Sequence, residues 1–186
     1  MLADLTKSGA AAAYAALAEF ERLAALVPSA PGLIDRIAVA DAVSERHARY
    51  RALLDALGST DGLEREMSAA APALDDARRR VESDDWWEGV AAAALCAPLT
   101  DELFGALLGR DEDSDPTEIA QWAGQRLRKA IDEDPVLAAR IALWSRRLVG
   151  EAIVLCRAFG GERYAELADR LAAHHVQRLT DLGLTG

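Results

Sequence analysis

The chain contains 186 residues, 51% of them hydrophobic, 28% charged and 5% aromatic, a composition that is typical of a globular protein and excludes a disordered chain. Its formal net charge of −10 disfavours nucleic-acid binding, because an acidic protein repels phosphate backbones at long range. The longest apolar run, Val90 to Leu99, is too short to span a bilayer, so no membrane partner is expected. With no basic-then-apolar leader, and with Cys96 and Cys156 expected to be buried thiols, the sequence predicts a cytoplasmic protein.

Prolines and glycines divide the sequence into segments of helical length without strand-like alternation, which predicts an all-α protein. A first helix is expected from Ser8 to Val27 and a second from Pro31 to Leu57. Residues 59–83 suggest a long crossover connection with one or two short helical turns, broken at Pro72. The inward face of the second helix is predicted from its apolar repeat, which consists of Leu33, Ile37, Ala40, Val43, His47, Tyr50, Leu54 and Leu57.

The second half of the chain predicts three further long helices and a short one. The third long helix covers about Asp84 to Leu108 and is kinked by Pro98. An acidic turn over residues 111–115 precedes a helix that opens at Pro116. The remaining helices are expected from Pro135 to Phe159 and from Glu162 to Leu182. Together these elements predict one domain over residues 1–186, a helical bundle with four long core helices, a crossover and additional helices.

Three polar side chains lie on or near the predicted apolar faces. Glu21 has only apolar neighbours one turn away, so no residue of its own helix can pair with it. It is expected either at the solvent-exposed edge of the apolar face, or buried against a partner from another helix or a metal. Glu45 has Arg49 at i+4 and is expected on an exposed ion-pair face. His47 falls in the apolar repeat, where a hydrogen-bonded core histidine is the commoner case and a metal ligand the alternative.

A glutamate and a pair of histidines are further candidates in the C-terminal part of the chain. Glu151 follows Arg147 by one turn, and Arg147 is its expected structural partner. His174 and His175 cannot share a helical face and are expected to be a surface or packing pair. The sequence contains no P-loop, no glycine-rich dinucleotide motif and no zinc-ligand spacing.

Several segments resemble one family of helical proteins. The most specific are Trp86-Trp87-Glu88-Gly89 and Arg-Arg-Leu-Val-Gly-Glu-Ala at residues 146–152. Phe-Glu-Arg-Leu-Ala at 20–24, Ala-Ile-Asp-Glu-Asp-Pro at 130–135 and Leu-Gly-Leu-Thr at 182–185 add to them. Together they resemble ferritin-like proteins grouped with tRNA-(2-methylthio-isopentenyladenosine) hydroxylases.

The resemblance implies a ferritin-like up-down bundle in which two irons are held by single carboxylates from two helices and Glu-x-x-His pairs from two others. Glu21 matches the first-helix carboxylate, and Glu102 matches a second acidic position on the third long helix. The other matched positions carry no metal ligand: these are Arg46 and Arg49 in place of the first Glu and His, Ala97 in place of an aspartate, and Ile119 in place of the second histidine. No Glu-x-x-His or Asp-x-x-His occurs in the sequence.

These matches lead to the hypothesis of a degenerate iron site, in which Arg46 and Arg49 direct their charge toward Glu21 and Glu102. On this hypothesis the chain is a metal-free, non-catalytic bundle that acts through its surface or a residual cavity, with a homodimer as one possible assembly. A second hypothesis is an iron-dependent hydroxylase or oxidase with the atypical ligands Glu21, His47, Glu102 and Glu151. A third is a small-molecule binding protein in which Trp86, Trp87, Trp122 and Trp144 line a pocket. The sequence leaves open whether the chain is an enzyme, and on which substrate it would act.

Overall fold

The computed structural model describes residues 2–58, 62–82, 85–110 and 117–184. Helices make up these ranges, and no strand occurs in them, so the all-α prediction is confirmed. The elements are α1 (Leu2–Leu26), the 3₁₀ turn η1 (Val27–Ser29), α2 (Leu33–Leu57), α3 (Leu63–Val81), α4 (Trp86–Leu107), α5 (Glu118–Glu133), α6 (Pro135–Phe159), the 3₁₀ turn η2 (Gly161–Arg163) and α7 (Tyr164–Asp181). The predicted acidic turn at 111–115 and the helix start at Pro116 lie outside the described residues.

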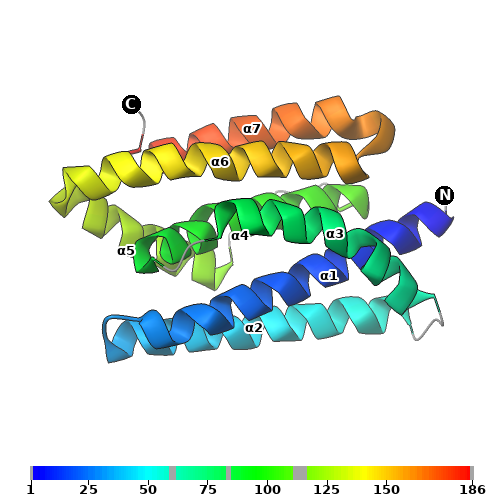
Figure 1. Ribbon diagram of the computed structural model, residues 1–186, viewed down its shortest axis with the longest axis horizontal. Helices are drawn as coiled ribbons and strands as arrows, with labels where there is room; N and C mark the ends of the chain where they lie inside the picture. Colours follow the sequence, from blue (N-terminus) through cyan, green and yellow to red (C-terminus); the bar gives the residue numbers. More distant parts are fainter. Residues whose placement is uncertain (1, 59–61, 83–84, 111–116, 185–186) are drawn as a thin grey trace.

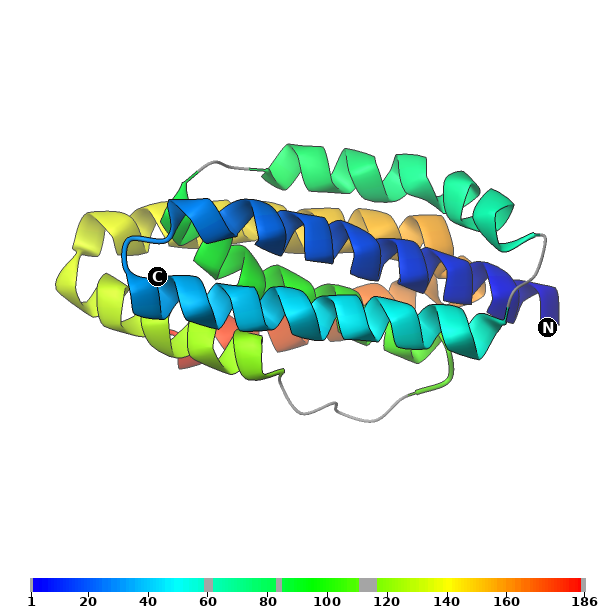
Figure 2. The ribbon, with the colours of Figure 1, turned by 90° about the horizontal axis from the view of Figure 1, so that it is seen from below.

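The helices form a bundle in which α4 occupies the centre. α1 and α2 are an antiparallel pair on one side of α4, and α6 and α7 are a second pair on the other side (Figure 1). α5 packs against α4 and α6, while α3 lies along α1 and also contacts α6 (Figure 2). α4 therefore touches both pairs, and any site between α1, α2 and α4 is enclosed from three sides.

Polar caps determine where three of the helices begin. The Asp85 carboxylate accepts a hydrogen bond from the backbone N–H of Glu88 at 3.1 Å at the start of α4. The Thr117 hydroxyl does the same for α5, and the Asp134 carboxylate accepts from two backbone N–H groups at the start of α6. These side chains accept hydrogen bonds from N–H groups that have no partner inside the helix. The predicted span of α6, from Pro135 to Phe159, is confirmed.

The prediction for residues 59–83 was wrong. They contain a continuous helix, α3, of 19 residues, rather than a connection with short turns. Its apolar side chains Ala70, Leu74 and Ala77 are buried at helical spacing against the bundle. Pro72 lies inside the helix on the exposed face, where water can bond the carbonyl that loses its intrahelical partner. The first helix was also predicted too short, since α1 begins at Leu2.

The predicted inward face of α2 was wrong as well. Its buried residues are Val39, Ala42 and Arg46. Leu33 and Ile37 from the predicted inward face are 72% and 52% exposed, and His47 is exposed too. Apolar residues occur on more than one side of this helix, so hydrophobicity alone does not define its orientation.

The core consists of two apolar clusters that share three helices. α1, α4 and α6 contribute residues to both clusters, one around Leu23, Leu95 and Ile141 and the other around Leu103 and Leu155. α4 is long and apolar enough to cross a membrane by length and composition, and 61% of its most apolar stretch is buried inside the protein. A central helix of a bundle meets the same criteria, and the burial of α4 identifies it as the core of this one.

Candidate functional site

Small side chains leave a cavity of about 340 Å³ between α1, α2 and α4. Ala12, Ala15 and Ala16 of α1, Ala52 of α2 and Ala97 of α4 form much of its wall. Leu53, Phe104 and Leu108 complete the apolar part. Charged side chains line the rest: Glu19, Arg46, Arg49, Asp101 and Arg110. We call this space the arginine cavity.

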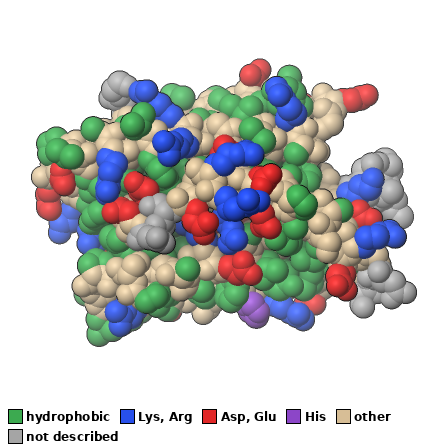
Figure 3. Space-filling view, viewed as in Figure 1, with side chains coloured by type: hydrophobic (Ala, Val, Ile, Leu, Met, Phe, Trp, Pro, Cys, Tyr) green, Lys and Arg blue, Asp and Glu red, His purple; other side chains and the backbone are tan. Residues whose placement is uncertain are grey.

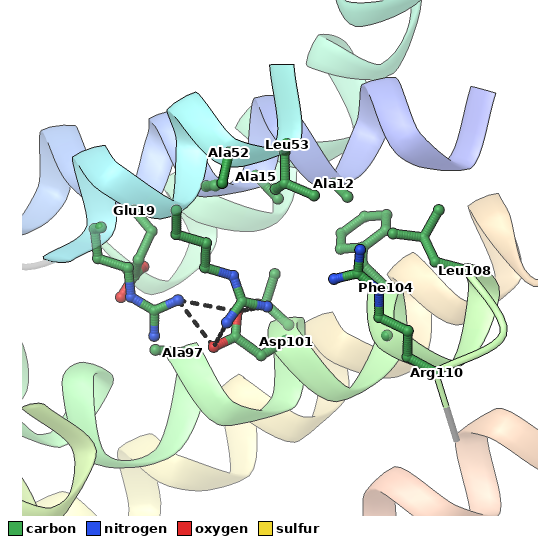
Figure 4. A pocket seen from close by; sticks show the side chains of 15 residues that line it. Ala12, Ala15, Glu19, Ala52, Leu53, Ala97, Asp101, Phe104, Leu108 and Arg110 are labelled. Atoms are coloured by element: carbon green, nitrogen blue, oxygen red, sulfur yellow. Dashed lines mark hydrogen bonds and ion pairs between the residues drawn. The ribbon is translucent and has the colours of Figure 1, made fainter. Parts of the chain in front are cut away.

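Two arginines of α2 meet one carboxylate of α4 in the arginine cavity. Arg46 Nη1 donates to both carboxylate oxygens of Asp101, at 2.8 and 3.0 Å. Arg49 binds the same carboxylate through both of its terminal nitrogens, each at 3.1 Å. Figure 4 shows the dashed lines converging on Asp101, which lies between Glu19 and Ala97 on one side and Phe104 on the other. The two arginines reach a common partner because residues at i and i+3 share a helical face.

Arg46 is the most deeply buried charged side chain among the described residues, with 1% of its surface exposed. Burial alone would lower its pKa, but the nearby Asp101 and Glu19 carboxylates outweigh burial and raise the pKa of Arg46 above its ordinary value. The side chain therefore remains a guanidinium cation. Its Nε and Nη2 atoms are buried and have no hydrogen-bond partner in the described part of the chain.

Glu19 provides a second partly buried carboxylate beside Arg46. Its carboxylate forms a two-point ion pair with Arg22, in which Nε donates to Oε2 at 3.0 Å, and Arg22 also donates to the carbonyl of Gly89. Burial by itself raises the pKa of Glu19, but the charge and hydrogen bonds of Arg22, with a smaller effect of Arg46, bring it below the ordinary value. Glu19 is therefore held as an anion. Burial, and then the charge of Glu19, raises the pKa of the Cys96 thiol to about 11.

Gly89 allows the Glu19–Arg22 pair to approach α4. A Cβ atom at this position would collide with Cδ1 of Leu26. The absence of a side chain lets α4 pack closely against the end of α1, with Arg22 Nη1 3.2 Å from the Gly89 carbonyl oxygen. The glycine of the Trp-Glu-Gly segment thus has a structural role next to the charged cluster.

These side chains do not fit an iron centre. A di-iron centre of the helical-bundle type uses carboxylate and imidazole ligands, and a guanidinium cannot act as a ligand because it stays protonated. The carboxylates of Asp101 and Glu19 already bind three arginines between them. Over the described ranges, no group of three or more His, Cys, Asp and Glu side chains is placed to hold a metal ion.

The expected partners of Arg46 and Arg49 were wrong. Glu21 is exposed and forms an ion pair with Arg78 of α3 at 3.6 Å. Glu102 faces α7 instead, where Arg178 Nη2 lies 3.0 Å and His174 Nδ1 lies 2.7 Å from its carboxylate. The expected and observed carboxylates differ by one residue on α4 and by two on α1, and each residue along an α-helix turns the side-chain direction by about 100°.

The remaining predicted site residues lie apart from one another. His47 is exposed on α2, with its ring 5.4 Å from that of Phe20. Glu151 pairs with Arg80 of α3 at 2.7 Å, not with Arg147, which is exposed. Ile119 is buried in the apolar core. The four atypical iron ligands proposed from the sequence therefore do not converge, whereas Arg46, Arg49 and Ala97 do line one cavity.

A second, larger cavity of about 530 Å³ lies between α1, α3, α4 and α6. Trp144 lines it, together with the acidic side chains Glu21, Glu82, Glu88 and Glu151. The other three tryptophans line neither this cavity nor the arginine cavity: Trp86 packs edge-on against Trp87 and Trp122, with ring centroids 6.5 and 6.4 Å apart. The four tryptophans of the third hypothesis therefore do not come together in either of these two cavities.

Sequence reasoning missed Glu19 and Asp101. A signal for Asp101 was present, because it follows Ala97 by four residues and shares its helical face. Glu19 and Arg22 are an i, i+3 pair of opposite charge inside an alanine-rich helix, which indicates a locally neutralised pair suited to burial. Both residues could be found only after the orientations of α1 and α4 were known.

Comparison with known proteins agrees with the architecture. No curated protein matches the chain. The family described as a ferritin-like domain of actinomycetes matches residues 2–173, nearly the whole chain. The chain therefore belongs to this family, the ferritin-like domains of actinomycetes.

Proposed function

We propose that this chain is a ferritin-like bundle that has lost a di-iron hydroxylase site and acts as a non-catalytic binding protein, related to the tRNA hydroxylase-like group. The observation that carries the proposal is the contact of Arg46 and Arg49 with Asp101. The arginines have the i, i+3 spacing of a Glu-x-x-His ligand pair. On this proposal, the two cations occupy the positions at which iron-binding relatives carry two ligands. We also propose that the protein is cytoplasmic.

The ion pairs explain how such a bundle stays folded without metal. Two partly buried carboxylates, Glu19 and Asp101, would destabilise the fold if nothing neutralised them. Arg22, Arg46 and Arg49 supply that neutralisation through hydrogen-bonded ion pairs. The polar interior of the ancestral bundle is thereby retained, and the metal is replaced by guanidinium groups.

The test is the metal content of the untagged protein, measured by inductively coupled plasma mass spectrometry after anaerobic loading with ferrous iron. We expect no iron above the level of a buffer control. A content of about two irons per chain, the number held by di-iron bundles, would overturn the proposal. Iron-dependent oxygen consumption by the purified protein would overturn it as well.

A variant with restored ligands makes the test sharper. Arg46→Glu together with Arg49→His creates a Glu-x-x-His pair on α2 that faces Asp101 and lies near Glu19. We expect this double variant to bind iron that the wild type does not bind. The matched control is Arg49→His alone, which keeps the Arg46 cation in place. Equal iron content in the wild type and the double variant would contradict the placement of the lost site.

A further inference from the structure

Arg46 has more hydrogen-bond donors than the protein satisfies. Only Nη1 is bonded, to Asp101, whereas Nε and Nη2 lack an acceptor among the described residues although only 2% of the side chain is exposed. Buried donors in native proteins are normally satisfied by protein, by ordered water or by a ligand. The N–H groups on Nε and Nη2 of Arg46 therefore need an acceptor that does not come from the described residues.

The charges around the arginine cavity favour an anionic acceptor. Arg46, Arg49 and Arg110 line it, against the carboxylates Asp101 and Glu19. Glu19 is already neutralised by Arg22, so among the described residues that line the cavity Asp101 is the carboxylate left to balance Arg46, Arg49 and Arg110, and it contacts the first two. Figure 4 shows Arg110 beside Phe104 and Leu108, at the opposite end of the cavity from Glu19. The cavity thus carries an excess of positive charge.

The walls of the cavity determine what else the ligand must be. Alanines from three helices, with Leu53, Phe104 and Leu108, form an apolar lining. A volume of about 340 Å³ lies at the small end of the range for ligand sites, which suits a compact molecule. Inorganic anions would leave the apolar walls without a partner. An oxyanion with a short apolar body satisfies both the walls and the arginines.

We propose that the arginine cavity binds a small organic carboxylate with a short aliphatic or aromatic body, its carboxylate held by Arg46 and its neighbours. The guanidinium group binds carboxylates in two-point geometry, which fits the unused N–H groups of Arg46. The second cavity is less suited to such a ligand, because five glutamates line its described part against two arginines, Arg22 and Arg78. This inference rests on the proposed function, since a metal would compete for Asp101 and Glu19.

The experiment titrates hexanoate into the protein, after its metal content has been measured, and follows binding by isothermal calorimetry and ¹H–¹⁵N correlation spectra. We expect saturable binding of hexanoate. Hexanamide, which has the same length without the charge, should bind at least about tenfold more weakly, and so should acetate and inorganic phosphate, which lack the apolar body. Equal binding of hexanamide, acetate or phosphate would overturn the assignment.

Two variants test the location without removing the buried Arg46, whose loss could unfold the protein. Ala52→Phe fills the cavity from an exposed position of α2 and should abolish hexanoate binding. Its matched control is Ala56→Phe, one turn further along α2, an exposed position that lines neither cavity. Arg110→Ala, at an exposed position, removes one cation from the cavity and should weaken binding. Binding that both Ala52→Phe and Arg110→Ala leave unchanged would overturn the proposal.

The metal measurement separates the two possible failures. Protein that holds iron would overturn the proposed function, whatever its response to hexanoate. Protein that holds no iron and does not bind hexanoate would leave the proposed function standing and overturn the carboxylate site alone. If the wild type holds no iron and binds hexanoate, and Ala52→Phe does not bind hexanoate, both the proposed function and the carboxylate site are supported.

Discussion

At the scale of single residues, Glu19 links burial to pH. Its carboxylate is partly buried near Cys96 and Arg46, yet its pKa is lowered because Arg22 neutralises it at close range. A group whose folded-state pKa lies below its unfolded value stabilises the fold above the unfolded pKa, and this contribution is lost as the pH falls through the folded pKa. The unfolded value is about 4.5, the ordinary value for glutamate.

Replacing Glu19 by glutamine should therefore destabilise the protein in a pH-dependent way. Near neutral pH we expect a loss of about 2 kcal/mol in the free energy of unfolding, because Arg22 loses a partly buried, charged hydrogen-bond partner. Below pH 4.5 the difference between wild type and Glu19→Gln should shrink steadily, since the wild-type carboxylate becomes protonated. Urea unfolding followed by circular dichroism from neutral to acidic pH measures both values.

The control for this series is Glu133→Gln, an exposed glutamate at the end of α5. It should change the free energy of unfolding by less than about 0.5 kcal/mol at any pH in the series. A difference between wild type and Glu19→Gln that grows on acidification would show that the carboxylate is not held charged by Arg22.

The charged cluster also shows where residue-level prediction stops. The pairing of Arg46 and Arg49 on one helical face follows from their spacing, which is a local property of α2. Their partner depends on how α4 is rotated about its axis, and Asp101 and Glu102 differ by one residue and by about 100°. That rotation is determined by packing of the entire α4 surface. The sequence identified the arginines and the adjacent Ala97, but not the carboxylate.

At the scale of whole elements, long helices with strong boundaries were predicted well, and helices with mixed signals were not. α6 begins after Asp134 and at Pro135 and ends before Gly160, and the predicted limits are those observed. α3 was missed because Pro72 outweighed its regular apolar spacing, although a proline on the exposed face is compatible with a helix held by tertiary packing. α2 buries an arginine, so its orientation contradicts hydrophobic patterning.

The start of α6 provides a test at this scale. The Asp134 carboxylate accepts hydrogen bonds from the N–H groups of Val136 and Leu137, at 2.9 and 3.0 Å. Asp134→Ala leaves both donors without this partner and should lower the free energy of unfolding by about 1 kcal/mol. Asp132→Ala, the same substitution at an exposed position two residues earlier, should have little effect. Equal losses in urea unfolding would show that the cap does not stabilise α6.

At the scale of the molecule, fold class was predictable because it depends on features repeated along the chain. Helix-length segments, abundant alanine and the absence of strand alternation all indicate a helical bundle. A cavity is different, because it is defined by what small side chains from α1, α2 and α4 leave empty. On the face shown in Figure 3, basic and acidic side chains are interspersed, with no continuous basic surface.

Net charge also leads to a prediction about the whole molecule. A charge of −10 destabilises the compact state through self-repulsion, and salt screens that repulsion. Salt also weakens exposed ion pairs such as Arg51–Asp55, but these contribute little to stability. The buried pair of Arg46 and Asp101 is screened much less, because only 2% and 17% of the two side chains are exposed. The stabilisation from screened charge repulsion should therefore exceed the destabilisation from weakened ion pairs, so that added salt stabilises the protein.

Raising sodium chloride from about 10 mM to about 200 mM should increase the melting temperature by about 2–4 °C, which corresponds to roughly 1 kcal/mol for a protein of this size. Potassium chloride should act equally, since screening depends on ionic strength and not on the cation. Asp169→Lys, at an exposed position of α7, makes the net charge less negative and should reduce the rise. A melting temperature that falls with salt would mean that ion pairs, and not net repulsion, control the electrostatic stability of the bundle.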